Sequence, residues 1–177
     1  MKTRLAIVLC ASLMSLACAP AQAQKVRLAT SQGDIVVELD KEKAPKTVEN
    51  FLQYVKAGHY DGTIFHRVIE NFMIQGGGMK ADMSEKPTRA PIPLESRSGL
   101  TNVRGTIAMA RTMDPNSATA QFFINVRSNL RLDFDYVTRK PGYTVFGRVL
   151  EGMDVVDGIS LVRTRTLGPF DDVPEAP

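Results

Sequence analysis

The residues best suited to chemistry lie in one short segment, residues 65–78, which has the sequence FHRVIENFMIQGGG. Arg67 stands among hydrophobic residues in this segment, and Phe72, Met73 and Gln75 follow it. An arginine offers a rigid fork of hydrogen-bond donors and stays charged, while the two apolar side chains are suited to form the walls of a pocket. Three consecutive glycines then indicate that the backbone turns or closely approaches another group. The segment therefore predicts a binding site.

Several other kinds of site lack the residues they need. His59 and His66 have no cysteine and no patterned carboxylates beside them, so we predict no metal site. We interpret His59 as a surface residue and His66 as one that orients its neighbours through hydrogen bonds. The glycines lack the lysine and hydroxyl residues of a phosphate-binding loop, and no G-x-S-x-G nucleophile motif occurs. We therefore expect no cofactor.

The elements that must position these residues are mostly short strands. Aliphatic and β-branched runs at residues 26–30 and 35–39 flank a turn-forming sequence and predict an opening β-hairpin. A proline-rich stretch, residues 87–93, forbids a regular helix and predicts a surface loop. Three later runs also predict strands: residues 106–110, 121–126 and 144–150.

Two segments predict helices. The first spans residues 45–56, where Pro45 suits the opening position and apolar residues recur on one face, namely Val48, Phe51, Leu52 and Val55. The second is shorter, at residues 153–159. Many short strands with only two helices indicate an all-β barrel or sandwich with helical caps.

Residues 1–23 have the features of a signal peptide. Lys2 and Arg4 precede an apolar stretch that is short for a membrane span, and residues 21–23 form an A-x-A cleavage sequence. This predicts an exported protein with a single mature domain, residues 24–177. A competing interpretation makes Cys18 the lipid-modified residue of a lipoprotein, although Ser15 stands where an aliphatic residue is usual. No later segment resembles a membrane helix.

Charge and cysteine content narrow the function further. The formal net charge is +3, and Lys2 and Arg4 supply two of these charges, so the mature domain is nearly neutral. Domains that bind nucleic acid are usually strongly basic, so we expect no nucleic-acid partner. Both cysteines, Cys10 and Cys18, precede residue 24, so the core must stabilise the mature domain without disulfides.

Taken singly, the candidate site residues also have structural explanations. Phe72, Phe123 and Leu132 belong to residue types found more often in a core than in a pocket. Arg67 could equally belong to a structural ion pair. The residues alone therefore predict a β-rich exported domain with a candidate apolar pocket.

The order of several motifs resembles the cyclophilins, which are peptidyl-prolyl cis-trans isomerases. Residues 65–69 followed by 72–77 are similar to the family signature, and residues 105–110 leading to 120–124 resemble its other pocket-forming segment. The resemblance covers essentially the whole mature chain, with further matches at residues 44–51, 132–133 and 145–149. It implies a closed eight-stranded antiparallel β-barrel capped by a helix at each end, with the active groove on the outer face.

The resemblance also implies roles for individual residues. Arg67 matches the catalytic arginine. Four residues match the positions that form the family's pocket for the substrate proline ring: Phe72, Met73, Phe123 and Leu132. The residues that match the family's contacts to the rest of the peptide are Gln75, Ala110, Arg111, Thr112 and Gln121. His66 matches the histidine beside the catalytic arginine. Tyr143 stands where many members have a groove histidine. The glycines at residues 76–78 then permit a tight turn.

The chemistry of prolyl isomerisation suits these residue types. Rotating a peptide bond costs roughly 18–20 kcal/mol because resonance is lost, and X-Pro isomers exchange over roughly tens to hundreds of seconds. A pocket that holds the ring, with an arginine that stabilises the localised nitrogen lone pair, would lower this barrier. Together with the signal peptide, the resemblance implies an enzyme of the bacterial periplasm, whose expected partners are proline-containing peptides and folding exported proteins. A non-catalytic proline-peptide-binding module or chaperone holdase is the alternative, and Arg67 favours the enzyme.

The chain departs from the family pattern in three places. Arg131 stands where many members have tryptophan or phenylalanine; that tryptophan contributes to cyclosporin binding, so we expect weak cyclosporin binding with isomerase activity retained. Residues 134–141 form a longer stretch that adds bulk at the groove edge. Relatives continue after residues 171–174 into one more apolar strand, so we expect a truncated sequence or an unpaired barrel edge.

Overall fold

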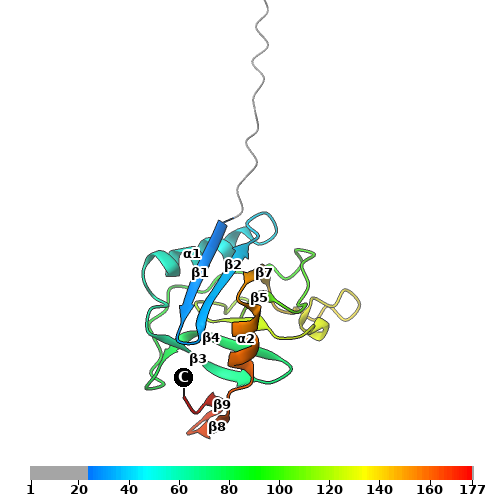
Figure 1. Ribbon diagram of the computed structural model, residues 1–177. Coiled ribbons are helices and arrows are strands. Elements are labelled where there is room, and N and C mark those ends of the chain that lie inside the picture. The colour runs from blue at the N-terminus through cyan, green and yellow to red at the C-terminus, as the bar shows by residue number, and fades with distance from the viewer. Residues whose placement is uncertain (1–23, 177) are drawn as a thin grey trace, which may run out of the picture.

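The computed structural model describes residues 24–176, and the predicted signal peptide lies outside these residues. A seven-stranded antiparallel sheet forms most of the domain, in the order β1-β2-β7-β5-β6-β4-β3, and a separate two-stranded sheet joins β8 and β9 (Figure 1). The strands are β1 (Gln24–Thr30), β2 (Gly33–Leu39), β3 (Thr63–Ile69), β4 (Met73–Lys80), β5 (Thr106–Met109), β6 (Phe122–Asn125), β7 (Val145–Glu151), β8 (Thr164–Leu167) and β9 (Phe170–Pro174).

The opening hairpin is confirmed. β1 and β2 pair along their whole length and end with Thr30 opposite Gly33, so residues 31–32 form a two-residue turn. β2 then buries every second side chain, as expected for a strand with one face on a core: Ile35, Val37 and Leu39. The three later predicted strands are also confirmed, each to within one residue at either end.

Both predicted helices are present. α1 (Pro45–Lys56) begins at the predicted proline, and Glu95 binds its first turn. The Glu95 carboxylate accepts hydrogen bonds from the backbone N–H groups of Lys46 (3.1 Å) and Thr47 (2.8 Å), which places a negative charge at the positive end of the helix dipole. α2 (Met153–Ser160) extends one residue beyond the predicted range.

The main core lies between the sheet and the two helices. Phe51 of α1 is fully buried, and its ring meets Phe122 edge-on at 5.7 Å and Phe146 at 5.2 Å. Val156 and Ile159 of α2 belong to the same core. In Figure 1, α1 lies near the upper ends of β1 and β2, and α2 lies near their lower ends.

The expected closed eight-stranded barrel is wrong for residues 24–176. β1 and β3 are the outer strands of the main sheet, and no pairing joins them, so the sheet is a half-barrel. A cavity of about 360 Å³ lies beside these two edges, lined among others by Val26, Leu28 and Phe65. The remaining strands, β8 and β9, pair with each other in a separate sheet and do not bridge β1 and β3.

The glycine run is not a turn, contrary to the final expectation. Residues 76–78 all lie inside β4, and the turn comes earlier, at residues 70–72. Gly77 has a φ of +85°, and a Cβ added there would lie 2.9 Å from ring atoms of Phe122 and Tyr60. The run therefore serves the other purpose that the sequence left open, a close approach of the backbone to neighbouring side chains.

Two further findings complete the fold. Residues 87–93 form a surface loop, as predicted, with one β-bridge from Ile92 to Ala118. Within residues 24–176, no helix combines the length and the apolar character needed to cross a membrane.

Candidate active site

Strand β3 directs Arg67 away from the main core. His66 and Val68, on either side of it, are buried, whereas the Arg67 side chain keeps 44% of its surface exposed. Neighbouring residues of a strand point to opposite faces of the sheet. Arg67 therefore lies on the face opposite to the core.

A row of side chains crosses this outer face from strand to strand. Arg67 of β3 pairs with Gln75 of β4, which in turn pairs with Phe123 of β6. Ala108 of β5 continues the row beyond Phe123. Directly opposed residues of antiparallel strands project to the same face, with Cβ atoms roughly 4.5–5.5 Å apart. A cation, an amide and an aromatic ring thus come together from three separate segments.

An apolar cluster surrounds Phe123. Its buried members are Met73, Ala108, Phe123 and Val145. The partly buried side chains that pack against them are Ile69, Phe72, Leu100, Ala110, Leu132 and Tyr143. All four residues predicted for the proline pocket therefore lie in one cluster that is distinct from the main core.

Buried asparagines hold the walls of this cluster. Asn125 donates to Asn102 Oδ1 (3.1 Å) and to Thr106 Oγ1 (3.0 Å). Asn129 donates to Asn125 Oδ1 (2.8 Å) and to the backbone carbonyl of Phe72 (2.9 Å). Buried polar groups are costly to leave unpaired, so this network fixes the turn that carries Phe72 against β6.

Tyr143 forms a further wall. Its ring meets Phe123 edge-on at 5.7 Å, and its backbone N–H donates to the carbonyl of Leu132 (2.8 Å). The guanidinium carbon of Arg111 lies 4.5 Å from the centre of the Tyr143 ring, and Arg111 Nε donates to the carbonyl of Gly142 (2.9 Å). A cation above an aromatic face is attractive, so Arg111 and Tyr143 stabilise each other's positions.

The sequence comparison settles the family. Over residues 25–176 the chain matches the model of the cyclophilin type peptidyl-prolyl cis-trans isomerases. The chain belongs to the cyclophilin family. It is therefore a peptidyl-prolyl cis-trans isomerase, an enzyme class whose substrates are proline-containing peptides.

Bacterial cyclophilins are similar over nearly the whole domain. The chain is 59% identical over 155 residues to a peptidyl-prolyl cis-trans isomerase of Streptomyces antibioticus, covering 86% of this chain and 92% of that protein. It is 53% identical over 152 residues to isomerase A of Dickeya dadantii, covering 86% and 79%. Isomerase B of Escherichia coli is 54% identical over 147 residues, with 82% and 90% covered.

Solved cyclophilin structures share the fold. A Cryptosporidium parvum cyclophilin, crystallised in the presence of the dipeptide Ala-Pro, has a TM-score of 0.69 at 27% identity and covers 86% of this chain and 92% of its own. A cyclophilin of Hirschia baltica has a TM-score of 0.68 at 27% identity and covers 86% and 70%.

The remaining predicted peptide contacts of this cyclophilin lie along the rim. Gln75 Nε2 donates to Gln121 Oε1 (2.9 Å), and Ala110 N donates to the carbonyl of Gln121 (2.9 Å). Thr112 lies in an exposed loop, where its hydroxyl bonds Ser117 (2.8 Å). Thr112 is therefore positioned by its own loop, and its carbonyl accepts a hydrogen bond from Arg111 Nη1 (2.8 Å).

His66 is placed differently from the other predicted contacts. Its side chain is buried, with 6% of its surface exposed, and lies beside Gln121; its Nδ1 has no hydrogen-bond partner within the described residues. Burial lowers the pKa of His66 below its usual 6.5, because desolvation disfavours the charged ring. The structure thus shows no orienting hydrogen bond at Nδ1.

His59 is not the surface residue that the sequence suggested. Its ring is half-buried against Tyr54, with 4.6 Å between ring centres, and its Nε2 lies 3.2 Å from the carbonyl oxygen of Gly77. Burial lowers its pKa as well. His59 therefore supports the glycine-rich part of β4.

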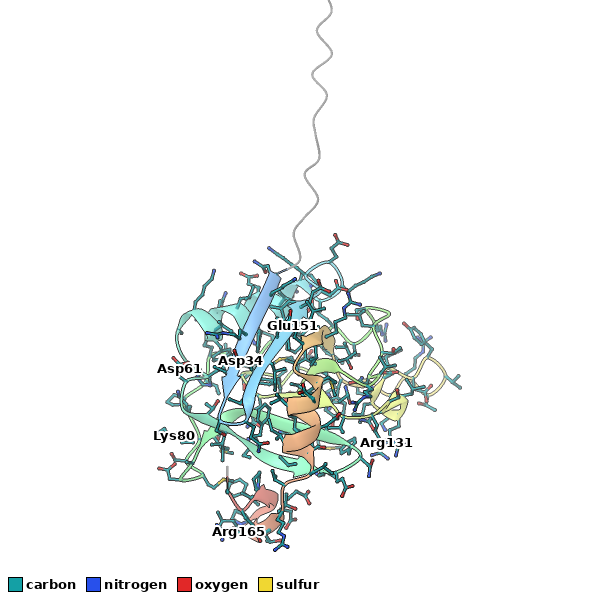
Figure 2. All side chains as sticks on the ribbon, viewed as in Figure 1. Asp34, Asp61, Lys80, Arg131, Glu151 and Arg165 are labelled. Carbon is teal, nitrogen blue, oxygen red and sulfur yellow. The ribbon has the colours of Figure 1, made fainter. Side chains whose placement is uncertain are left out.

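The longer stretch at residues 134–141 is a well-bonded loop beside the groove. Asp135 Oδ1 accepts hydrogen bonds from the backbone N–H groups of Val137 (2.8 Å) and Thr138 (3.1 Å). Just before this loop, the guanidinium carbon of Arg131 lies 4.8 Å from the centre of the Phe72 ring. Figure 2 shows Arg131, which lies within the short helical turn η1 (Leu130–Leu132), at the periphery of the molecule.

Sequence reasoning missed part of this site. Ala108 and Val145 are buried members of the cluster that were not predicted. Ala108 lies two positions before the predicted Ala110, and Val145 lies two positions after the predicted Tyr143. The period of two along a strand could have identified both. Asp172 was also missed: its Oδ2 lies 3.5 Å from Arg67 Nε, and no local pattern links two positions so distant in the chain.

Proposed function

We propose that Arg67 and the apolar cluster around Phe123 form the groove in which this cyclophilin rotates X-Pro bonds. The row from Arg67 through Gln75 to Phe123 carries the proposal, because it sets a cation beside an apolar pocket on one face of a rigid sheet. The proline ring occupies the pocket formed by Phe72, Met73, Phe123 and Leu132.

Arg67 acts on the peptide nitrogen. Rotation localises the nitrogen lone pair, and a donor aimed at that atom stabilises the twisted state more than either planar isomer. Asp172 contacts Nε of Arg67, and within residues 24–176 no hydrogen bond engages either Nη group. The Nη groups are thus the donors available to the substrate. This is electrostatic catalysis by a preorganised group, and no covalent bond is made or broken.

The rim residues hold the chain on both sides of the proline. Gln75, Gln121, Ala110, Arg111 and Thr112 offer amide, backbone and guanidinium groups that suit a peptide backbone. Tyr143 closes the groove next to Phe123, with its ring edge-on to it. His66, buried next to Arg67 in the sequence and close to Gln121, supports this rim from within the protein.

We further propose that the substrates are exported proteins that fold in the periplasm. The support is the basic start, the apolar stretch and the A-x-A sequence of residues 1–23. Export should produce a protein that begins at Gln24. Mass spectrometry of the exported protein decides this, since a lipid-modified Cys18 at the N-terminus would establish the lipoprotein alternative instead.

A refolding assay separates the enzyme from the holdase. Residues 24–177, added at about one hundredth of the concentration of a client whose refolding is limited by prolyl isomerisation, should accelerate the slow phase, because a catalyst turns over. A holdase would act only near stoichiometric amounts and would slow the recovery of native client. Arg67→Ala is the matched control, and acceleration that survives this substitution would contradict the assigned role of Arg67.

A further inference from the structure

The C-terminal hairpin reaches the edge of the candidate active site. β9 lies against β3, and in Figure 1 the red β8–β9 hairpin sits at the end of the domain next to that strand. Figure 2 shows Arg165 of β8 at the same extremity. Within residues 24–176, the one ion pair of Arg67 is with Asp172 of this hairpin, at 3.5 Å between Nε and Oδ2.

The backbone at Asp172 is unusual. β8 and β9 pair through Arg165 opposite Val173 and Leu167 opposite Phe170, with a register shift between the two pairs. Two residues of β9 therefore oppose one of β8, which is a β-bulge, and bulges redirect side chains next to active sites. Asp172 itself has a φ of +58°, a conformation that aspartate tolerates better than most residues but that is still strained.

The hairpin holds its position without help from Asp172. Val173 and Pro174 are buried, and the backbone N–H of Glu175 donates to the carbonyl of Arg163 (3.0 Å). The neighbouring Asp171 bonds within the hairpin, where its Oδ1 accepts from the hydroxyl of Thr166 (2.9 Å). Other residues thus hold the hairpin in place, and the Asp172 side chain projects from it toward Arg67.

We propose that Asp172 is a positioning residue for Arg67. The inference rests on the proposed catalytic role of Arg67. A half-exposed arginine with no partner samples many rotamers, and each turnover must select the one that faces the peptide nitrogen. A carboxylate at Nε removes much of this freedom and leaves both Nη groups for the substrate.

The carboxylate also has an opposing effect, because it partly neutralises the charge that Arg67 offers to the substrate. Both side chains keep more than a third of their surface exposed, at 44% and 37%, so water and salt weaken this effect. The restriction on rotamers acts across the 3.5 Å contact itself, which is shorter than the Debye length of about 10 Å at 0.1 M salt, so it persists at moderate ionic strength. We therefore expect the net contribution of Asp172 to be favourable.

Two variants isolate the contact. Asp172→Asn keeps the shape and tolerates the positive φ but removes the charge, and Asp172→Gly removes the side chain while permitting the same backbone. Asp171→Asn is the matched control, since it deletes an equal charge one residue away from the contact. Two-dimensional exchange NMR on an Ala-Pro peptide gives kcat and KM for each purified protein, and thermal unfolding verifies that each is folded.

Both Asp172 variants should lower kcat by about two- to fivefold and change KM by less than about twofold, while Asp171→Asn matches the wild type. Raising NaCl to about 1 M should bring the wild type toward the rate of Asp172→Asn, because salt screens the pair. Unchanged or higher kcat in both Asp172 variants overturns the inference. If Arg67→Ala loses activity in the same assay, the proposed function survives that failure; if Arg67→Ala is fully active, the proposed function itself fails.

Discussion

Arg67 shows how a single residue acquires a role from neighbours that are distant in the sequence. Gln75 lies opposite it across a strand pair, and Asp172 reaches it from the last strand of the described chain. Sequence reasoning identified Arg67 and Phe72 because they stand in one short motif. Phe123 and Leu132 were identified as site residues only through the family resemblance. Asp172 was not predicted, because an ion pair between distant segments produces no periodic pattern in the sequence.

A prediction at this scale concerns Arg131, whose guanidinium lies over Phe72. We expect weak cyclosporin binding by the wild type. Arg131→Trp should tighten it on the order of tenfold, because an indole adds apolar contact area where the arginine offers a charge. The chain contains no tryptophan, so the new side chain also reports binding by fluorescence. Tight binding by the wild type, or no gain in the variant, contradicts this account.

Strand β4 shows why the elements were predicted better than their details. Local composition predicted the opening hairpin and α1, because the patterns typical of strands and helices involve residues that are close together in the sequence. The same composition cannot say whether glycines turn the chain or admit a neighbour. At Gly77 the aromatic rings that need the space come from Phe122 and Tyr60, which other parts of the chain supply.

A pair of glycines tests this explanation. Gly62 and Gly77 both have positive φ, but nothing lies within 4 Å of a Cβ at Gly62. Alanine at Gly62 should cost about 1–2 kcal/mol of unfolding free energy for the backbone alone. Alanine at Gly77 should cost about 1–3 kcal/mol more, because the methyl group also meets two rings. Denaturant titration measures both, and equal losses would show that crowding at Gly77 is unimportant.

The whole molecule is a half-barrel in which one face of the sheet packs on the main core and the other carries the candidate active site. The main core stabilises the sheet from one face, and the apolar cluster with Arg67 lies on the other. Motif order identified the family, but strand closure was predicted wrongly. Whether β8 and β9 join the main sheet depends on pairing between distant edges, which short-range patterns do not encode.

Stability should respond to pH through the two histidines. Burial lowers the pKa of His59 and of His66 below the value of 6.5 that applies to the unfolded chain. Below that value the unfolded chain binds more protons than the folded chain, so the free energy of unfolding falls as the pH drops through 6.5. Carboxyl groups such as Asp157, whose pKa is lowered by Arg104, contribute only at more acidic pH.

The measurement is the denaturation midpoint at about pH 7.5 and about pH 5.5. We expect a lower midpoint at the acidic value, and a smaller difference in His66→Gln, because the variant lacks one of the two titrating groups. His59→Gln serves as the comparison, since its ring is less buried. A midpoint that does not change with pH would show that burial leaves both rings free to charge.

The most direct test of the central claim is the rate of exchange of an Ala-Pro peptide, measured by NMR with wild type, Arg67→Lys and Arg67→Ala. Arg67→Ala should lower kcat/KM on the order of 10²- to 10³-fold, because it removes the donor to the twisted amide. Arg67→Lys should also be poor, since an ammonium keeps the charge but lacks the planar fork. Thermal stability should change little, because the side chain is half-exposed. A wild-type rate in folded Arg67→Ala would contradict the account.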